Sequence, residues 1–96
     1  NAPAKLAPTP MKPKSVRLFV KPGCPWCDEA MEWLDQHGVG YELLDVTRNA
    51  DARREMRELT DQTCAPSLDV DGHILADFGA DELEAWWRQM DFEPAA

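Results

Sequence analysis

Hydrophobic and polar residues follow patterns that change along the chain from strand-like to helix-like. Residues 15–20 (SVRLFV) alternate and are rich in residues that favour strands. The stretch from Pro25 to His37 has helical spacing, with proline at the first helical position and Gly38 where a left-handed cap is expected. The apolar face predicted for this helix consists of Trp26, Ala30, Trp33, Leu34 and His37.

The middle of the chain repeats this change of pattern. Residues 40–46 (GYELLDV) predict a second strand. Asn49 or Thr47 is placed to cap a second helix that continues through Thr60. The apolar positions of this charged helix are Ala52, Met56 and Leu59.

A hairpin and a last helix complete the pattern. Asp71-Gly72 separates two short apolar runs, residues 66–70 and 73–77, and Asp-Gly in this setting strongly indicates a hairpin. The last helix is expected to open at Asp81. Its apolar positions, which we interpret as core, are Leu83, Trp86, Trp87 and Met90.

The predicted order of elements is therefore β-α-β-α-β-β-α, an α/β fold. The βαβ start implies a parallel strand pair and the hairpin adds antiparallel strands, so we expect a four-stranded mixed sheet flanked by helices. A chain of 96 residues has room for one domain. We assign residues 1–14 to a proline-rich flexible tail and residues 15–96 to the domain.

Charge and hydropathy exclude two classes of partner. The net charge is −8, and all 18 acidic residues lie in residues 28–96, which argues against nucleic-acid binding. No apolar run approaches the roughly 20 residues of a membrane span, so no membrane partner is expected. No signal-peptide pattern is present, although the chain begins with Asn1 and leaves open a segment removed earlier.

Three cysteines bring in candidate chemistry, two of them in the pair Cys24-Pro25-Trp26-Cys27. Three is a poor number for a disulfide framework. A structural zinc site needs about four ligands, and only Cys64 and the scattered His37 and His73 are available to join the pair. A redox pair in a reducing compartment fits better, and we expect a cytoplasmic protein.

The position of the pair favours thiol–disulfide exchange. Cys24 is expected at the helix N-cap and Cys27 in the first turn, so the two sulfurs face each other. Free N–H groups, the helix dipole and the nearby Lys21 stabilise a thiolate at Cys24. Cys24 is therefore the predicted nucleophile and Cys27 the resolving thiol.

Three motifs together resemble the glutaredoxin family. Residues 21–27 (KPGCPWC) resemble its motif of a lysine three residues before C-P-Y-C. Cys64-Ala65-Pro66 stands where glutaredoxins carry T-V-P with a cis proline, and residues 78–83 (FGADEL) stand where they carry G-G-x-D-D-L. The resemblance covers about residues 16–87 and implies a thioredoxin-like fold.

The resemblance also implies a glutathione-binding groove. Lys21 would meet the glycine carboxylate, and the backbone of Ala65 would pair with the cysteinyl part. The start of the last helix would hold the γ-glutamyl end through backbone N–H groups and the Asp81 carboxylate, although Asp81 is equally suited to be a plain helix cap. The residues implied are Lys21, Trp26, Ala65, Pro66, Gly79, Ala80 and Asp81.

Three positions depart from the family pattern. Trp26 replaces tyrosine and keeps a flat apolar wall. Phe78 replaces the first glycine of its motif, where it either crowds the γ-glutamyl end or faces the core. Cys64 replaces threonine, either as a small buried side chain or as a third redox thiol. We predict that a Cys24–Cys27 disulfide dominates on oxidation and that Cys64 stays free.

The resemblance implies a monomeric dithiol enzyme without a covalently bound cofactor. It would reduce protein disulfides and glutathione mixed disulfides, with glutathione as the reductant. One alternative is a redoxin reduced by thioredoxin reductase. Another is a binding protein in which Cys24 and glutathione hold an iron–sulfur cluster across a dimer, and Pro25 argues against it because cluster-binding glutaredoxins usually lack that proline.

Overall fold

Four strands form one mixed sheet in the order β2-β1-β3-β4. The central strand β1 (Val16–Val20) runs parallel to β2 (Glu42–Asp45) and antiparallel to β3 (Ser67–Val70). β3 pairs in turn with β4 (His73–Ala76). The predicted mixed sheet is confirmed.

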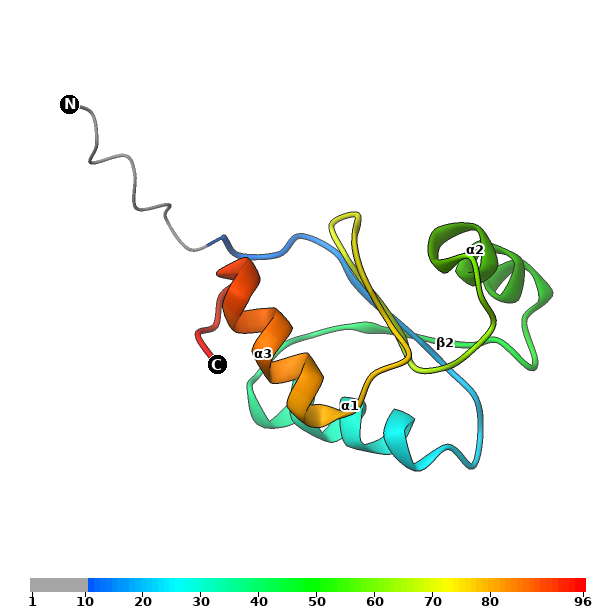
Figure 1. Ribbon diagram of the computed structural model, residues 1–96, viewed down its shortest axis with the longest axis horizontal. Helices are drawn as coiled ribbons and strands as arrows, with labels where there is room; N and C mark the ends of the chain where they lie inside the picture. Colours follow the sequence, from blue (N-terminus) through cyan, green and yellow to red (C-terminus); the bar gives the residue numbers. More distant parts are fainter. Residues whose placement is uncertain (1–10) are drawn as a thin grey trace.

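Three helices cover this sheet unequally. The computed structural model, which describes residues 11–96, places α1 (Pro25–Gln36) and α3 (Ala80–Met90) side by side on one face. α2 (Ala50–Thr60) lies on the other face (Figure 1). The element order β-α-β-α-β-β-α is the predicted one. No helix among the described residues is long and apolar enough to cross a membrane.

Most of the predicted stop and start positions are explained by local hydrogen bonds and backbone angles. The Asn49 side chain accepts the Ala52 N–H at 3.0 Å and caps α2, while Thr47 instead donates to the Asp45 carboxylate. Asp71 and Gly72 both have positive φ, 51° and 92°, as a type I′ hairpin turn requires. These features depend on residues close together in sequence, which is why the pattern predicts them.

The start of α3 differs from the prediction. Gly79, not Asp81, is the N-cap, and Asp81 lies in the first helical turn. The Glu82 carboxylate accepts the Gly79 N–H at 2.8 Å and so supplies the reciprocal half of a capping box. Gly79 has no side chain to cap the helix, so the first turn is stabilised instead by Glu82, a residue within the helix.

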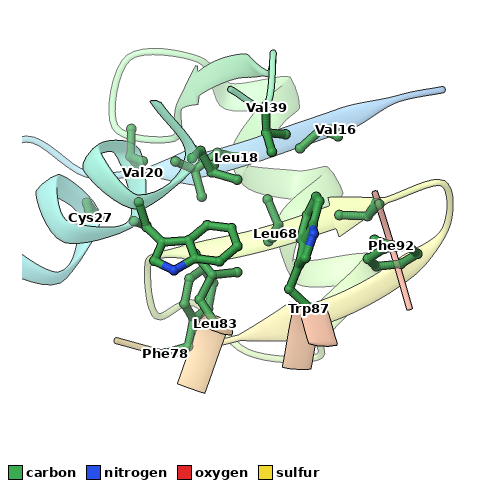
Figure 2. Close-up of a cluster of buried hydrophobic side chains, with 14 residues drawn as sticks. Val16, Leu18, Val20, Cys27, Val39, Leu68, Phe78, Leu83, Trp87 and Phe92 are labelled. Atoms are coloured by element: carbon green, nitrogen blue, oxygen red, sulfur yellow. The ribbon is translucent and has the colours of Figure 1, made fainter. Parts of the chain in front are cut away.

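The main core lies between the sheet and the α1/α3 layer (Figure 2). The indole of Trp87 is fully buried, lies edge-on to Trp33 at 5.6 Å between ring centroids, and donates from Nε1 to the Pro94 carbonyl at 2.8 Å. Trp86 is half-buried against Phe92. The interpretation of Trp86 and Trp87 as packing residues is confirmed.

The apolar face of α1 is rotated from the predicted one. Trp26 is 57% exposed, and Cys27 is buried in its place beside Ala30 and Leu34. Positions 27, 30 and 34 form one buried stripe at spacings of three and four residues, and the way α1 packs on the sheet leaves Trp26 outside it. The prediction that Trp26 shares the apolar face of this helix is therefore wrong, whereas the wall of the groove implied by the resemblance requires an exposed side chain.

The face under α2 holds a smaller apolar cluster of Phe19, Val46, Ala52 and Met56. Leu59, predicted on the buried side of this helix, is exposed.

Charged side chains add to that small cluster. Arg17 on β1 donates to Asp69 on β3 at 2.6 Å and forms an ion pair with Glu55 on α2 at 2.9 Å. Arg17 and Asp69 are opposite each other in the β1–β3 register, so one guanidinium links two strands and a helix.

The segment before β1 contacts the domain. Met11 makes two backbone hydrogen bonds with the chain after α3, to Asp91 and Glu93. The N–H groups of Lys14 and Ser15 donate to the Asp71 carboxylate in the hairpin turn. The rest of the predicted tail, residues 1–10, lies outside the described residues.

Candidate active site

Cys24 occupies the N-cap of α1, directly after the turn that follows β1. Its backbone is extended, with φ −97° and ψ 111°, and its Sγ accepts the Cys27 N–H at 3.2 Å. Pro25 takes the first helical position, where a missing N–H costs nothing. A thiolate at Cys24 would therefore face the positive end of the helix dipole, as the sequence predicts.

Cys27 has a different environment. Its side chain is 2% exposed and packs at one end of the main core (Figure 2), and no disulfide joins any two of the three cysteines. Burial raises the pKa of the Cys27 thiol to about 12, with a further contribution from its hydrogen bond to Cys24. At neutral pH, Cys27 is thus a protonated, water-shielded thiol beside a half-exposed one.

The loop before β3 closes over this pair. The Ala65–Pro66 bond is cis, which confirms the prediction made from the resemblance. The Cys24 Sγ lies 3.9 Å from the Ala65 carbonyl oxygen, and Pro66 is buried beneath. The structure therefore brings Cys24, Ala65 and Pro66 together from segments about 40 residues apart.

Cys64 is exposed, so its interpretation as a small buried side chain is wrong. The loop that carries it is braced by Gln62, which accepts the Cys64 N–H and donates to the Cys64 carbonyl at 3.2 Å. Gln62 also donates to the Ser67 hydroxyl at 3.3 Å. The Cys64 thiol is thus presented to solvent by a loop with its backbone held in place.

The start of α3 approaches the exposed face of α1. A Cβ at Gly79 would lie 3.5 Å from Trp26 Cδ1, an ordinary contact distance, and 3.1 Å from Glu82 Oε1, which would have to shift slightly. Phe78 is buried in the main core (Figure 2), so of its two interpretations the core-facing one is confirmed. Asp81 is exposed on the first turn. Trp26 and Gly79 therefore border one surface, and Asp81 follows Gly79 on the first turn of α3.

Lys21 and potential metal ligands complete the inventory of predicted site residues. Lys21 is half-buried, directly after β1, and forms no ion pair with an acid of residues 11–96. Within the same range, no three His, Cys, Asp or Glu side chains gather as metal ligands.

A hollow on the α2 side was not predicted from the sequence. Its volume is about 690 Å³, and it lies between α2 and the loop of residues 61–64. The sequence held one indication, because three of the five basic residues in positions 28–96 fall within positions 53–57. The lining includes Arg53, Arg54, Arg57, Glu58, Asp61 and Cys64.

Comparisons with known proteins agree with this geometry. The sequence profile of the family described as Glutaredoxin matches residues 16–75. The chain belongs to the glutaredoxin family. Glutaredoxin 3 of Escherichia coli K12 is 31% identical over 80 residues, 83% of this chain and 94% of the relative.

Two further proteins show the range of this glutaredoxin's relatives. A glutaredoxin-like 8.6 kDa protein of Clostridium pasteurianum is 29% identical over 69 residues, 72% of this chain and 92% of that protein. The crystal structure of the thioredoxin-like protein BC3987 superposes with a TM-score of 0.69 at 30% identity, over 74% of this chain and 97% of that one. The thioredoxin-like fold is thus shown, and with it a thiol–disulfide redox protein with a C-x-x-C pair.

Proposed function

We propose that this glutaredoxin reduces protein disulfides and glutathione mixed disulfides, with glutathione as the electron donor. The observation that carries the proposal is the contrast between a half-exposed Cys24 at a helix N-cap and a buried, protonated Cys27 one turn later. One sulfur is accessible to a substrate disulfide, and the other is accessible only to Cys24.

The exchange balances in two steps. The Cys24 thiolate attacks one substrate sulfur, forms a mixed disulfide and releases the other sulfur as a thiolate. Cys27 then attacks the Cys24 sulfur, its proton passes to a released thiolate, and the second substrate thiol leaves. The substrate disulfide is reduced to two thiols while the Cys24–Cys27 pair is oxidised. Two glutathione molecules reduce the pair again and become glutathione disulfide.

Glutathione would lie in the surface bordered by Lys21, Trp26 and the start of α3. The N–H groups of Ala80 and Asp81 are in the first helical turn and have no intrahelical acceptor, which favours a carboxylate there. The Asp81 carboxylate suits the ammonium group of the γ-glutamyl end. The similarity to glutaredoxin 3 supports this use of glutathione.

Reduction by thioredoxin reductase is a second candidate, favoured by a specific feature of the same surface. The Glu82 and Glu29 carboxylates would lie 3.1 and 3.9 Å from a Cβ at Gly79, so negative charge surrounds the place where the γ-glutamyl carboxylate would bind. We expect a monomer in the cytoplasm under either candidate.

The test compares the two reductants on one substrate set. Turnover of a protein disulfide and of a glutathionylated peptide is measured with glutathione and glutathione reductase, and separately with thioredoxin reductase. We expect the glutathione system to support both substrates. Turnover only with thioredoxin reductase would replace the first candidate by the second.

Two variants test the division of roles between the cysteines. Cys24→Ser is expected to abolish both activities, because the accessible sulfur at the N-cap of α1, next to Cys27, is lost. Cys27→Ser is expected to lose protein-disulfide reduction and retain deglutathionylation, because one thiol suffices for a glutathione mixed disulfide. A Cys27→Ser protein inactive on both substrates, beside an active Cys24→Ser protein, would reverse the assignment.

A further inference from the structure

We infer that Glu82 is a specificity residue, whose carboxylate weakens the binding of the γ-glutamyl carboxylate of glutathione at the start of α3. Thiols with an uncharged group in place of that carboxylate are favoured relative to glutathione. The inference rests on the proposed function and deepens it, because it names the side chain that sets which thiol the redox pair prefers. Glu82 is separated from the sulfurs and acts on the ligand through charge.

The Glu82 carboxylate is held at the positive end of α3. It accepts the N–H of Gly79, the N-cap residue, at 2.8 Å. Its Oε1 would lie only 3.1 Å from a Cβ at Gly79, so the side chain folds back over the first turn instead of extending into solvent. The helix dipole stabilises a negative charge in this position. The carboxylate is therefore already in place before any ligand arrives.

A ligand carboxylate would be drawn to the same end of the helix. The N–H groups of Ala80 and Asp81 lie in the first turn and have no intrahelical acceptor. A carboxylate that accepts them would lie beside the Glu82 carboxylate, and two like charges at short range repel each other. The γ-glutamyl carboxylate is thus attracted by the two N–H groups and repelled by Glu82.

The neighbouring acid Asp81 has the opposite effect. Asp81 is exposed and forms no ion pair with a base of residues 11–96, so its carboxylate is available to a ligand ammonium group. The γ-glutamyl end carries an ammonium group and a carboxylate on the same carbon. Asp81 therefore attracts one of these groups while Glu82 repels the other, so the two acids select a ligand that keeps the ammonium group and lacks the carboxylate.

A further acid, on α1, adds to the repulsion. The Glu29 carboxylate would lie 3.9 Å from a Cβ at Gly79, and neither Glu29 nor Glu82 forms an ion pair with a base of residues 11–96. In the proposed function, Lys21 meets the glycine carboxylate at the other end of glutathione. The negative charge beside Gly79 is therefore not neutralised by a neighbouring base, and it acts mainly on the γ-glutamyl end.

The test compares glutathione with an analogue in which only the α-carboxylate of the γ-glutamyl residue is replaced by a primary amide. The full chain is oxidised to the Cys24–Cys27 disulfide, and the rate of its reduction by each thiol is measured. Glu82→Gln removes the charge and keeps an oxygen for the Gly79 N–H, because glutamine also forms a capping box. Glu42→Gln is the matched control, because Glu42 is exposed at the start of β2 and forms no ion pair within residues 11–96.

The measured quantity is the rate with glutathione divided by the rate with the amide analogue. We expect this ratio to be about three to ten times higher in Glu82→Gln than in the original protein, and added salt to shrink the difference. Glu42→Gln, and Glu82→Asp, which keeps the charge, should have ratios near that of the original protein. An unchanged ratio in Glu82→Gln, or an equal rise in Glu42→Gln, would overturn the inference.

A binding measurement separates this inference from the proposed function. S-methyl derivatives of glutathione and of the amide analogue, which cannot exchange disulfides, are titrated into the reduced chain while backbone amide resonances are followed by NMR. Tighter binding of S-methylglutathione to Glu82→Gln, by about three to ten times, with no gain for the amide, supports the inference even if glutathione does not reduce the protein. In that case the proposed function fails alone. Equal affinities in the two proteins, or no shifts in residues 78–83, overturn the inference whatever the redox result.

Discussion

The two faces of the sheet differ in what holds their helices. On the α1/α3 face, fourteen buried residues form one core that includes Trp33, Leu34 and Trp87. On the α2 face, four residues form the buried cluster, and the Arg17 guanidinium links α2 to the sheet through Glu55. Apolar burial stabilises roughly in proportion to area, so the first face is the more strongly fixed.

This difference places the redox pair and the hollow beside α2 on different faces of the sheet. The redox pair belongs to the strongly packed face, since Cys27 is part of its core and Cys24 caps α1. The hollow between α2 and the loop of residues 61–64 lies on the lightly packed face. The large core therefore fixes the positions of the two sulfurs. In contrast, α2 is held by the smaller apolar cluster and by the ion pairs of Arg17 with Asp69 and Glu55, here called the ion triad.

Truncation of one large side chain on each face gives the largest expected effects. Trp87→Ala should lower the free energy of unfolding by about 3–5 kcal/mol, because it opens a cavity and leaves the Pro94 carbonyl without its donor. Met56→Ala should cost less, about 2–3 kcal/mol, because its cluster is small. Denaturant unfolding of both variants measures the difference.

Amide hydrogen exchange serves as the control for that pair. Met56→Ala should speed exchange in α2 before α1, whereas Trp87→Ala should speed it in α1 and α3 together. A larger loss for Met56→Ala than for Trp87→Ala would show that the α2 face is the better packed one.

The ion triad predicts an intermediate effect. Arg17→Met should cost about 1–3 kcal/mol of unfolding free energy, because the buried Asp69 keeps only the Gly72 N–H donor, at 2.8 Å, on its other oxygen. The Arg17 pKa is raised by hydrogen bonds to Glu55 and Asp69, so the guanidinium is charged at every pH that preserves the fold. Thermal or denaturant unfolding at neutral pH provides the measurement.

A second substitution makes this test specific. Arg17→Met/Asp69→Asn should recover part of the loss, because no buried charge then lacks a partner. Glu55 is the more exposed acid of the triad. If Glu55→Gln lowered the free energy of unfolding as much as Arg17→Met, the Arg17–Asp69 pair between the strands would not be the main contribution.

The smallest expected effect is an alkaline loss of stability in the reduced protein. The thiol of Cys27 ionises near 9 in the unfolded chain and near 12 in the fold. Its contribution to stability is therefore complete below pH 9 and is lost as the pH rises toward 12, by about 1.4 kcal/mol at pH 10. Denaturant unfolding under reducing conditions from pH 8 to pH 10 measures this slope.

The matched control is Cys27→Ala, in which the free energy of unfolding should fall less steeply with pH over the same range. Some slope should remain, because burial also raises the pKa of Tyr41, and Tyr41→Phe should remove that part. Identical slopes with and without Cys27 would contradict its buried, protonated state.

Local features of this protein are determined by its sequence. The Asn49 cap, the positive-φ Asp71-Gly72 turn and the Cys24 N-cap all depend on bonds or backbone angles within about four residues. The strand and helix order follows from hydrophobic spacing. The three motifs of the family were recognisable together, and the expected cis Ala65–Pro66 bond is present.

Burial and long-range pairing were decided only by the tertiary structure. Trp26 and Cys27 are neighbours in sequence, and the hydrophobic pattern alone does not decide which of them is buried. The direction of α1 relative to the sheet buries Cys27 and exposes Trp26. Cys64 is exposed because Gln62 and the cis-proline loop hold its backbone at the surface. The Arg17–Asp69 pair joins residues 52 positions apart. No local pattern encodes such contacts, because each depends on how separate elements pack against one sheet.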